Sequence, residues 1–415
     1  MCLKNLKKYS LLFYKVELTM KLLSTLLSNI FDKWLNNILV NTFISIALYC
    51  GLFVGDSHAF DSHPLNTATF FEQYKLVDVS DGFDIPWAMV QLPNNDILVS
   101  ERRGKLRVIR QGKLLDIAIS GLPKIDGNGQ GGLLDLAIDP NFNDNTWLYF
   151  TYADDSGEGQ GSNTALMRAK LNIENLTLSE QTRLYKGQLN STKGQHYGSR
   201  IAFDNQGYVY FSIGDRGKRD ENPQDLNKDG GKIYRLHKDG RIPADNPFAD
   251  EKGVKSAVYS YGHRNPQGLA FDTSTDLLWS HEHGPKGGDE INVISAGKNY
   301  GWPIVSFGVN YSGTKFTDIT EKKGMENPAL YWLPSIAPSA MIFITSDKYP
   351  KLKGKFLLGS MKFGYIVVVS IDGNKVKQQF KLLDNLGRVR SLMQGVDGFI
   401  YVGLDGGGIK KLFPQ

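Results

Sequence analysis

Six short segments of similar design recur along the chain, and this repetition constrains the fold more than any other feature. Each segment has a polar turn, usually with Asn, Asp or Gly, that leads into a short apolar run. The six segments are residues 95–100, 145–150, 206–211, 275–280, 353–358 and 397–402. Successive segments are about 45 to 80 residues apart, a spacing that fits a four-stranded sheet with loops of variable length. From Phe60 onward no segment has a long helical period, so the pattern indicates antiparallel strands.

We therefore predict an all-β fold over residues 60–415, a six-bladed β-propeller of four-stranded antiparallel blades. A large β-sandwich would also be all-β and is the alternative. A propeller gathers loops at one end of a central channel, so ligand-binding groups should come from loops far apart in sequence. The 44 glycines and a charged fraction of 22% are typical of a folded, turn-rich chain.

The first 59 residues have the layout of an export signal. Scattered lysines precede an apolar run at residues 38–54, and Ser57-His58-Ala59 supplies small residues for a cut after Ala59. The basic part is long, which makes Met20 an alternative start. We predict a leader at residues 1–59 and a periplasmic protein. A membrane anchor is the rival interpretation, although a run of about 17 residues is short for a bilayer span.

The leader also holds both cysteines, Cys2 and Cys50. The remaining chain would then have no disulfide, no cysteine metal site and no cysteine nucleophile. Without the leader, 42 basic residues stand against 40 acidic ones, so charge gives no reason to expect a nucleic-acid partner.

A histidine and an aspartate are spaced so that a strand pair could bring them together. His196 and Asp215 are separated by about the length of a hairpin-like return. Asp215 could fix the tautomer of His196 and raise its basicity, as a general base requires. From spacing alone, a packed or solvated pair is the commoner explanation of two such residues.

Polar side chains crowd a second segment, residues 261–272, just before a predicted strand. Arg264 could stabilise developing negative charge, and Asn265 or Gln267 could orient a planar heterocycle. The alternative is a loop whose polar groups cap its own backbone.

A third segment, residues 281–292, contains groups that could bind a metal ion. His281 and His283 suggest zinc or copper, but no third nitrogen or sulfur ligand stands nearby. Backbone carbonyls of Gly284 and Pro285 with nearby carboxylates suit calcium better, because calcium takes six to eight oxygens.

Two further features have simpler explanations. The glycine-rich stretch around Gln130 lacks the helix and Lys-Ser/Thr of a phosphate loop, so we reject a nucleotide site. Lys362, Arg388 and Arg390 lie on separate turns, where cations usually form solvated surface; convergence on a polyanion is the alternative.

Together these segments resemble the soluble quinoprotein glucose and aldose sugar dehydrogenases. The matching stretches are residues 86–89, 129–134, 196–217, 261–268, 284–302 and 332–338. Motifs in this order over nearly all of residues 60–415 are specific. The resemblance implies an oxidoreductase that uses pyrroloquinoline quinone (PQQ) and calcium to oxidise an aldose at C1 to the lactone.

The resemblance also implies roles for individual residues. His196 corresponds to the base that takes the C1 hydroxyl proton, Asp215 to its orienting carboxylate, and Arg264 to the cation beside the quinone oxygen. Side chains that match cofactor or sugar contacts are Gln130, Asn265 and Ser335. The cations that match partners of the cofactor's three carboxylates are Lys362, Arg388 and Arg390. Gly284 and Pro285 match the calcium that touches the quinone, and Glu290 and Tyr300 match a second, structural calcium site.

Departures from the glucose-specific members shape the substrate and assembly predictions. His283 stands where those enzymes carry Gln, and Ser335 replaces Thr. The chain lacks the insertions that support their dimer, so we expect a monomer of the broader aldose type. The electron acceptor, a quinone or a cytochrome, is not specified by any residue. A calcium-dependent propeller lactonase and a non-catalytic binding propeller are the alternative functions.

Overall fold

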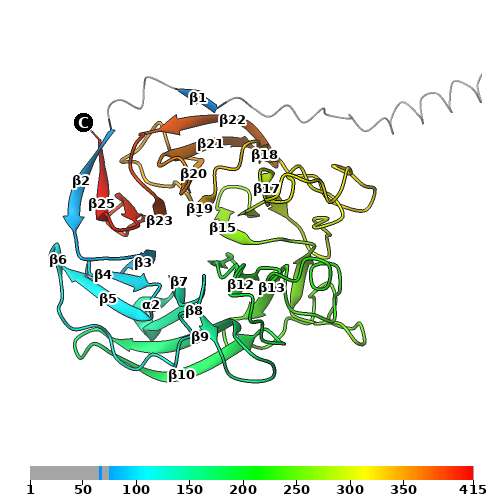
Figure 1. Ribbon diagram of the computed structural model, residues 1–415. Helices are drawn as coiled ribbons and strands as arrows, with labels where there is room; N and C mark the ends of the chain where they lie inside the picture. The colour runs from blue at the N-terminus through cyan, green and yellow to red at the C-terminus, as the bar shows by residue number, and fades with distance from the viewer. Residues whose placement is uncertain (1–64, 68–73, 415) are drawn as a thin grey trace, which may run out of the picture. The chain divides into compact units, whose positions relative to one another are not determined.

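The described part of the chain forms six β-sheets arranged as the blades of a propeller (Figure 1). The computed structural model describes residues 65–67 and 74–414. Within these residues the structure is nearly all β, which confirms the predicted fold class. The innermost strands of neighbouring blades contact one another around the ring.

The first three blades follow in chain order, each an antiparallel meander of four strands. Blade A contains β3 (Pro86–Gln91), β4 (Ile97–Glu101), β5 (Lys105–Arg110) and β6 (Lys113–Leu114). Blade B contains β7 (Leu133–Ile138), β8 (Trp147–Asp154), β9 (Asn163–Asn172) and β10 (Thr177–Lys186). Blade C contains β11 (Ile201–Phe203), β12 (Tyr208–Ile213), β13 (Lys232–His237) and β14 (Val258–Tyr261). The one short helix of the described chain, α2 (Phe142–Asn145), lies between β7 and β8.

The last three blades complete the ring. Blade D contains β15 (Pro266–Asp272), β16 (Leu277–Glu282), β17 (Asp289–Ile294) and β18 (Leu330–Trp332). Blade E contains β19 (Pro338–Phe343), β20 (Lys355–Ser360), β21 (Ile366–Asp372) and β22 (Lys375–Leu382). Blade F contains β23 (Val389–Gln394), β24 (Ile400–Leu404), β25 (Gly408–Pro414) and, as its outer strand, β2 (Tyr74–Ser80).

The two ends of the propeller chain meet in blade F. Strand β2 pairs antiparallel with β25, with Leu76 opposite Leu412, so the first strand of the ring closes the last sheet (Figure 1). Blade E differs from the predicted four strands, because β1 (Leu65–Thr67) adds a fifth strand parallel to β22. An outer strand leaves backbone donors and acceptors unpaired, and an added segment satisfies them.

The six recurring sequence segments all contribute to the second strand of a blade. They correspond to β4, β8, β12, β16, β20 and β24. These strands are buried on both faces; Leu98 and Val99 of β4 point to opposite faces and are both fully buried. Burial on both faces explains why the segments read as apolar runs and not as strict alternation.

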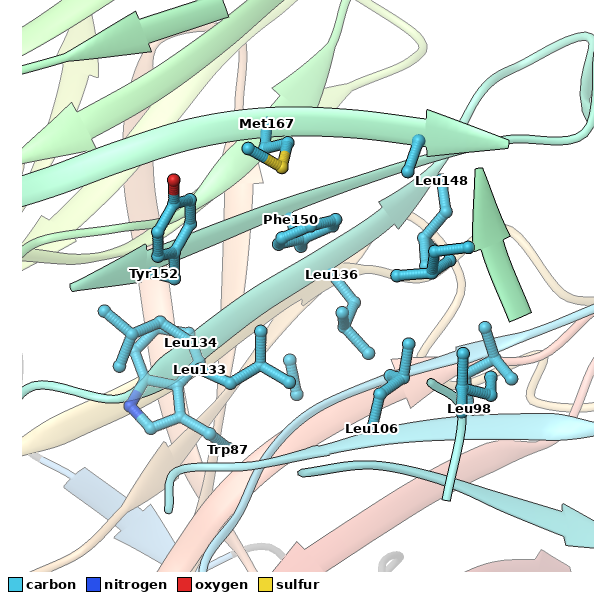
Figure 2. Close-up of a cluster of buried hydrophobic side chains, with 14 of the residues drawn as sticks. Trp87, Leu98, Leu106, Leu133, Leu134, Leu136, Leu148, Phe150, Tyr152 and Met167 are labelled. Carbon is cyan, nitrogen blue, oxygen red and sulfur yellow. The ribbon is translucent and has the colours of Figure 1, made fainter. Parts of the chain in front are cut away.

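Hydrophobic clusters fill the spaces between neighbouring blades. In the described chain each of the six clusters joins one adjacent pair of blades. Figure 2 shows the cluster between blades A and B, to which Trp87, Leu98 and Leu106 of blade A and Leu136 and Phe150 of blade B belong. No blade buries its faces alone, so the ring is stable only as a whole.

Side chains near the channel also link the blades by hydrogen bonds to the backbone of the next blade. At five junctions a hydroxyl donates to a carbonyl at 2.6–3.1 Å: Ser100 to Leu134, Thr151 to Ser199, Ser212 to Pro266, Ser339 to Val389, and Ser391 to Pro86. At the junction of blades D and E, Nε2 of His283 donates to the carbonyl of Pro338 at 2.5 Å.

The predicted leader, residues 1–59 with Cys2 and Cys50, lies outside the described residues, as does the boundary at Phe60. Its export and cleavage stay predictions. Across the part that the structure describes, we find no helix with the length and apolar character to cross a membrane.

Candidate active site

Two neighbouring cavities contain most of the residues singled out in the sequence. The first, which we call the arginine cavity, has a volume of about 450 Å³ and receives residues from all six blades. One from each blade region is Trp87, Leu134, Tyr197, Gln267, Ala337 and Arg390. The second, the histidine cavity, has a volume of about 460 Å³ and is lined by His196, Asp215, Arg264, Pro285 and Trp302, among others.

The predicted pair of His196 and Asp215 is formed. Nδ1 of His196 lies 2.6 Å from Oδ1 of Asp215, and the Asp215 side chain is almost fully buried. The same Oδ1 accepts the backbone N–H of Gly217 at 2.8 Å, and Oδ2 accepts Nε1–H of Trp302 at 2.9 Å. With Nδ1 held by Asp215, Nε2 of His196 is left to exchange a proton with a ligand.

Burial and charge set the protonation of this pair. Burial lowers the pKa of His196 below its ordinary value. The hydrogen bond that His196 donates to Asp215 raises this pKa, and the charge of Arg264 lowers it further. For Asp215, burial alone would raise the pKa, but the hydrogen bond and charge of His196, with Arg264 and Gly217, outweigh it and lower the pKa. At neutral pH the pair is therefore a neutral imidazole and a carboxylate, which suits a general base.

Close backbone contacts bring His196 beside Asp215. A side chain at Gly214 would place its Cβ 2.3 Å from the carbonyl oxygen of His196, so only glycine permits this approach. His196 itself has φ of 56°, an uncommon conformation for a residue with a side chain. Its backbone N–H donates to Oε1 of Gln130 at 2.9 Å. Such backbone strain occurs more often at functional sites.

Two consecutive residues connect the cavities. Arg264 lines the histidine cavity, and Asn265 lines the arginine cavity. Nη1 of Arg264 donates to the carbonyl of His283 at 3.0 Å, and its backbone N–H donates to Glu282. Oδ1 of Asn265 accepts the backbone N–H of Gly198 at 3.0 Å, which leaves its amino group for a ligand. The polar groups of this segment therefore line the two cavities and do not only cap the backbone of their own loop.

The predicted cations divide into two groups. Arg388 and Arg390 line the arginine cavity and share the carboxylate of Asp405. Lys362 is exposed, lines neither cavity, and holds its ammonium 5.0 Å from the ring of Phe363. Sequence reasoning missed Arg102, which does line the arginine cavity. Its position in a blade A turn gave no signal, because a turn arginine is usually solvated.

Sequence reasoning also missed the role of Asp289, a fully buried carboxylate. Its Oδ2 accepts Oγ–H of Ser335 at 2.7 Å and the backbone N–H groups of Ile336 and Ala337, and Oδ1 accepts N–H of Gly284 at 2.9 Å. Asp289 therefore ties the wall of the arginine cavity to the predicted calcium loop. The hydroxyl of Ser335, which was predicted to contact the cofactor or the sugar, donates its hydrogen to Asp289 in this structure.

The residues predicted to bind calcium would do so through oxygen atoms only. Pro285 lines the histidine cavity, and no described residue donates a hydrogen bond to the carbonyl of Gly284 or Pro285. For the second predicted site, burial and the charge of Glu282 raise the pKa of Glu290 to about 8. Close by, Oδ1 of Asn292 is buried without a hydrogen-bond partner. Carbonyl, carboxyl and amide oxygens are the types of ligand that calcium accepts.

Two observations bear on these metal predictions. The hydroxyl of Tyr300 donates to the carbonyl of Val293 at 2.6 Å and accepts N–H of Ser295, so its side chain is already bonded. Residues 65–67 and 74–414 hold no group of three or more His, Cys, Asp and Glu side chains that could bind a metal. Zinc or copper sites are usually built from such groups, whereas calcium also accepts backbone carbonyls.

Comparisons with known proteins identify the family of this chain. The family described as glucose/sorbosone dehydrogenase matches residues 83–411. Aldose sugar dehydrogenase YliI of Escherichia coli is 38% identical over 343 residues, covering 81% of this chain and 92% of that protein. Quinoprotein glucose dehydrogenase B of Acinetobacter calcoaceticus is 32% identical over 290 residues, covering 63% and 60%.

A solved structure shows the same fold. The soluble aldose sugar dehydrogenase from E. coli, in its apo form, superimposes with a TM-score of 0.79 at 37% identity, covering 82% of this chain and 100% of that one. The relatives are named as dehydrogenases of sugars, and the range matched by the family, residues 83–411, includes both cavities. The chain belongs to the glucose/sorbosone dehydrogenase family and is an oxidoreductase that acts on the CH–OH groups of sugars.

Proposed function

We propose that this enzyme oxidises aldoses at C1 to the lactone, with PQQ as hydride acceptor, calcium as an accessory ion, and an external electron acceptor. The observation that carries the proposal is a buried His–Asp pair in one cavity beside a second cavity rich in arginine. His196 removes the proton of the C1 hydroxyl through Nε2, and Asp215 holds the tautomer that leaves Nε2 free. Arg264 stabilises negative charge that develops between the two cavities.

The arginine cavity fits the chemistry of PQQ, a planar tricarboxylate. Three guanidinium groups, those of Arg102, Arg388 and Arg390, face one carboxylate, that of Asp405, so positive charge is in excess. Nε of Arg102 is buried without a partner. Aromatic rings of Trp87 and Tyr197 offer apolar walls, and amides of Gln130 and Asn265 offer hydrogen bonds. When bound, PQQ accepts the hydride that leaves C1.

The name of the Acinetobacter relative, a quinoprotein, supports the same cofactor. Carbonyls of Gly284 and Pro285 would hold a calcium ion that polarises the acceptor as a Lewis acid. Glu290 would contribute to a second calcium site. The leader pattern supports export to the periplasm, and the missing insertions support a monomer. Electrons would leave to a quinone or a cytochrome.

Reconstitution tests the proposed reaction. The chain, purified without cofactor, is expected to reduce an artificial dye in the presence of an aldose only after PQQ and calcium are added. Omission of calcium, or its removal by a chelator, should lower the rate. Quinone binding without dye reduction for any aldose tested would contradict the proposed reaction, as would hydrolysis of a lactone without dye reduction.

The contact between Trp302 and Asp215 predicts a shift in pH dependence. The neutral form of His196 is the base, so kcat/KM should fall as pH drops through its pKa, which burial places below the ordinary value. Trp302→Phe removes the N–H donated to Asp215. The carboxylate then attracts the imidazolium proton more strongly, so the pKa of His196 and the acid limb of kcat/KM should move upward.

Two measurements check this shift, the pH profile of kcat/KM and an NMR titration of His196 in the cofactor-free chain. Trp279→Phe is the matched control, because Nε1 of the buried Trp279 has no hydrogen-bond partner among the described residues. That variant should leave the pKa of His196 unchanged. Equal pKa values in wild type and Trp302→Phe would show that the indole N–H has no influence on the base.

A further inference from the structure

The cations of the arginine cavity are not equivalent. Nε and Nη2 of Arg390 donate to the two oxygens of Asp405 at 3.0 and 2.8 Å, and Nε of Arg388 donates to Oδ2 at 3.1 Å. One carboxylate thus neutralises much of the charge of two guanidinium groups. A ligand that approaches Arg388 and Arg390 has to share them with Asp405.

Arg102 differs from these two in having no carboxylate partner. Among the described residues no acidic group lies within ion-pair distance of its guanidinium, and Nη1 donates only to the backbone carbonyl of Gly129. Its Nε is buried and makes no hydrogen bond. The Arg102 side chain as a whole is only partly buried, but a buried polar atom without a hydrogen-bond partner can be satisfied by a ligand or water.

The backbone fixes Arg102 where it can serve a ligand. It lies in the turn between β4 and β5, where its N–H donates to the carbonyl of Ile85 at 3.1 Å and its carbonyl accepts N–H of Leu133 at 3.1 Å. The approach is so close that a Cβ at Gly132 would overlap the Arg102 carbonyl. The backbone of this turn is therefore held between blades A and B.

A second contact connects Arg102 to the base. Its bond to the Gly129 carbonyl holds the loop that carries Gln130, whose Oε1 accepts the backbone N–H of His196. A ligand that engages Arg102 would thus be bound at the loop that supports His196. Burial and then the charge of Arg390 lower the pKa of Arg102, against the charges of Asp405 and Asp84, which raise it.

We propose that Arg102 is a primary anion-binding residue of the arginine cavity and that it pairs with a carboxylate of the cofactor. The inference rests on the proposed function, because it takes the anionic ligand to be PQQ. It assigns to Arg102 a contact that the sequence suggested for Lys362. Lys362 is exposed and outside the lining, whereas Arg102 is in the lining and unpaired.

Direct binding of PQQ to the cofactor-free full chain tests the assignment without any measurement of turnover. With calcium present, affinity is followed by calorimetry or by quenching of tryptophan fluorescence. Arg102→Gln is expected to weaken binding about tenfold or more, the effect of losing a charge-assisted hydrogen bond to a desolvated anion. Binding by the variant should also depend less on salt, because one ionic contact is lost.

A matched control is the next residue, Arg103. Its side chain is 78% exposed and pairs with Asp84 on the surface, so Arg103→Gln should bind PQQ as the wild type does. Arg102→Lys keeps the charge but loses the planar fork, and an intermediate affinity is expected. This conservative variant also keeps the test valid should the Gln variant fail to fold.

The outcomes separate the inference from the function on which it rests. If wild type and Arg103→Gln bind PQQ and Arg102→Gln binds equally well, the assignment of Arg102 is overturned while the proposed function stands. If the wild type binds no PQQ, the proposed function fails and the inference fails with it. A selective loss in Arg102→Gln, partly restored in Arg102→Lys, supports both.

Discussion

Turnover should fall by about 10²–10⁴-fold when His196 is replaced by alanine, the range expected for loss of a general base. The His196 ring is the group whose Nδ1 is held 2.6 Å from Asp215, and it lines the histidine cavity. PQQ affinity should change little, because the ring is not in the lining of the arginine cavity. Steady-state kinetics with an aldose and a dye, together with PQQ titration, measure both quantities.

The control for this change is His237→Ala. His237 ends β13, packs against the ring of Tyr208 and lies in neither cavity lining, so its loss should leave turnover unchanged. Turnover of His196→Ala equal to that of the wild type would remove His196 from the role of base. A parallel loss of PQQ binding would indicate that the ring supports the cavity instead of the proton transfer.

The largest loss of stability is expected for Arg200→Met. Arg200 is buried, its Nη1 pairs with Asp135 at 3.0 Å, and its Nε donates to the carbonyl of Gln267 at 2.7 Å. Its guanidinium also lies 4.0 Å from the ring of Trp87. These contacts join the regions of blades A, B, C and D. Removing one partner of a buried ion pair costs about 3–5 kcal/mol in the free energy of unfolding.

Denaturant titration of Arg200→Met and wild type measures this loss, and pH supplies a further check. Burial raises the pKa of Asp135, and Arg200 opposes that rise. Without Arg200 the carboxyl of Asp135 resists ionisation more strongly, so the loss of stability should be greatest at high pH. It should shrink as pH falls and Asp135 takes up a proton in the folded state.

Two further variants test whether loss of the buried ion pair causes the loss of stability. Arg241→Met removes an ion pair with Asp239 in which the Arg241 side chain is 74% exposed, and it should change stability little. Arg200→Met combined with Asp135→Leu removes both buried charges and should recover part of the loss. An Arg200→Met variant as stable as Arg241→Met would show that the buried pair contributes nothing to the ring.

Local sequence pattern was sufficient for the architecture. The second strand of each blade is buried on both faces, so its apolar run is set by burial and appears in the sequence six times. The outer strands are more exposed and carry weaker patterns, as β10 shows with several exposed residues. Neither β1 nor the closing pair of β2 with β25 could be predicted, because such pairings depend on residues far apart in the chain.

The residues of the candidate site also fall into two groups, those that local sequence identified and those that it did not. Residues 196 and 215 lie on one blade, so their meeting follows from a local hairpin, and the sequence identified them. Arg102, Asp289 and Trp302 were assigned no role, because their partners come from other loops or other blades. A turn arginine or a buried carboxylate acquires a role only when the closed ring places other loops around it.

The sequence by itself therefore determined the repeated blades and the family, and it identified His196 and Asp215 as a candidate pair, since each depends on short segments or on their order. The tertiary structure decided how the cations are arranged and changed the set of three that the resemblance implied. It placed Arg388 and Arg390 beside Asp405, left Lys362 outside the lining, and brought Arg102 in from blade A. Side chains from separate blades meet at a central cavity only because six sheets close into a ring. No short segment of the sequence predicts which side chains that closure brings together.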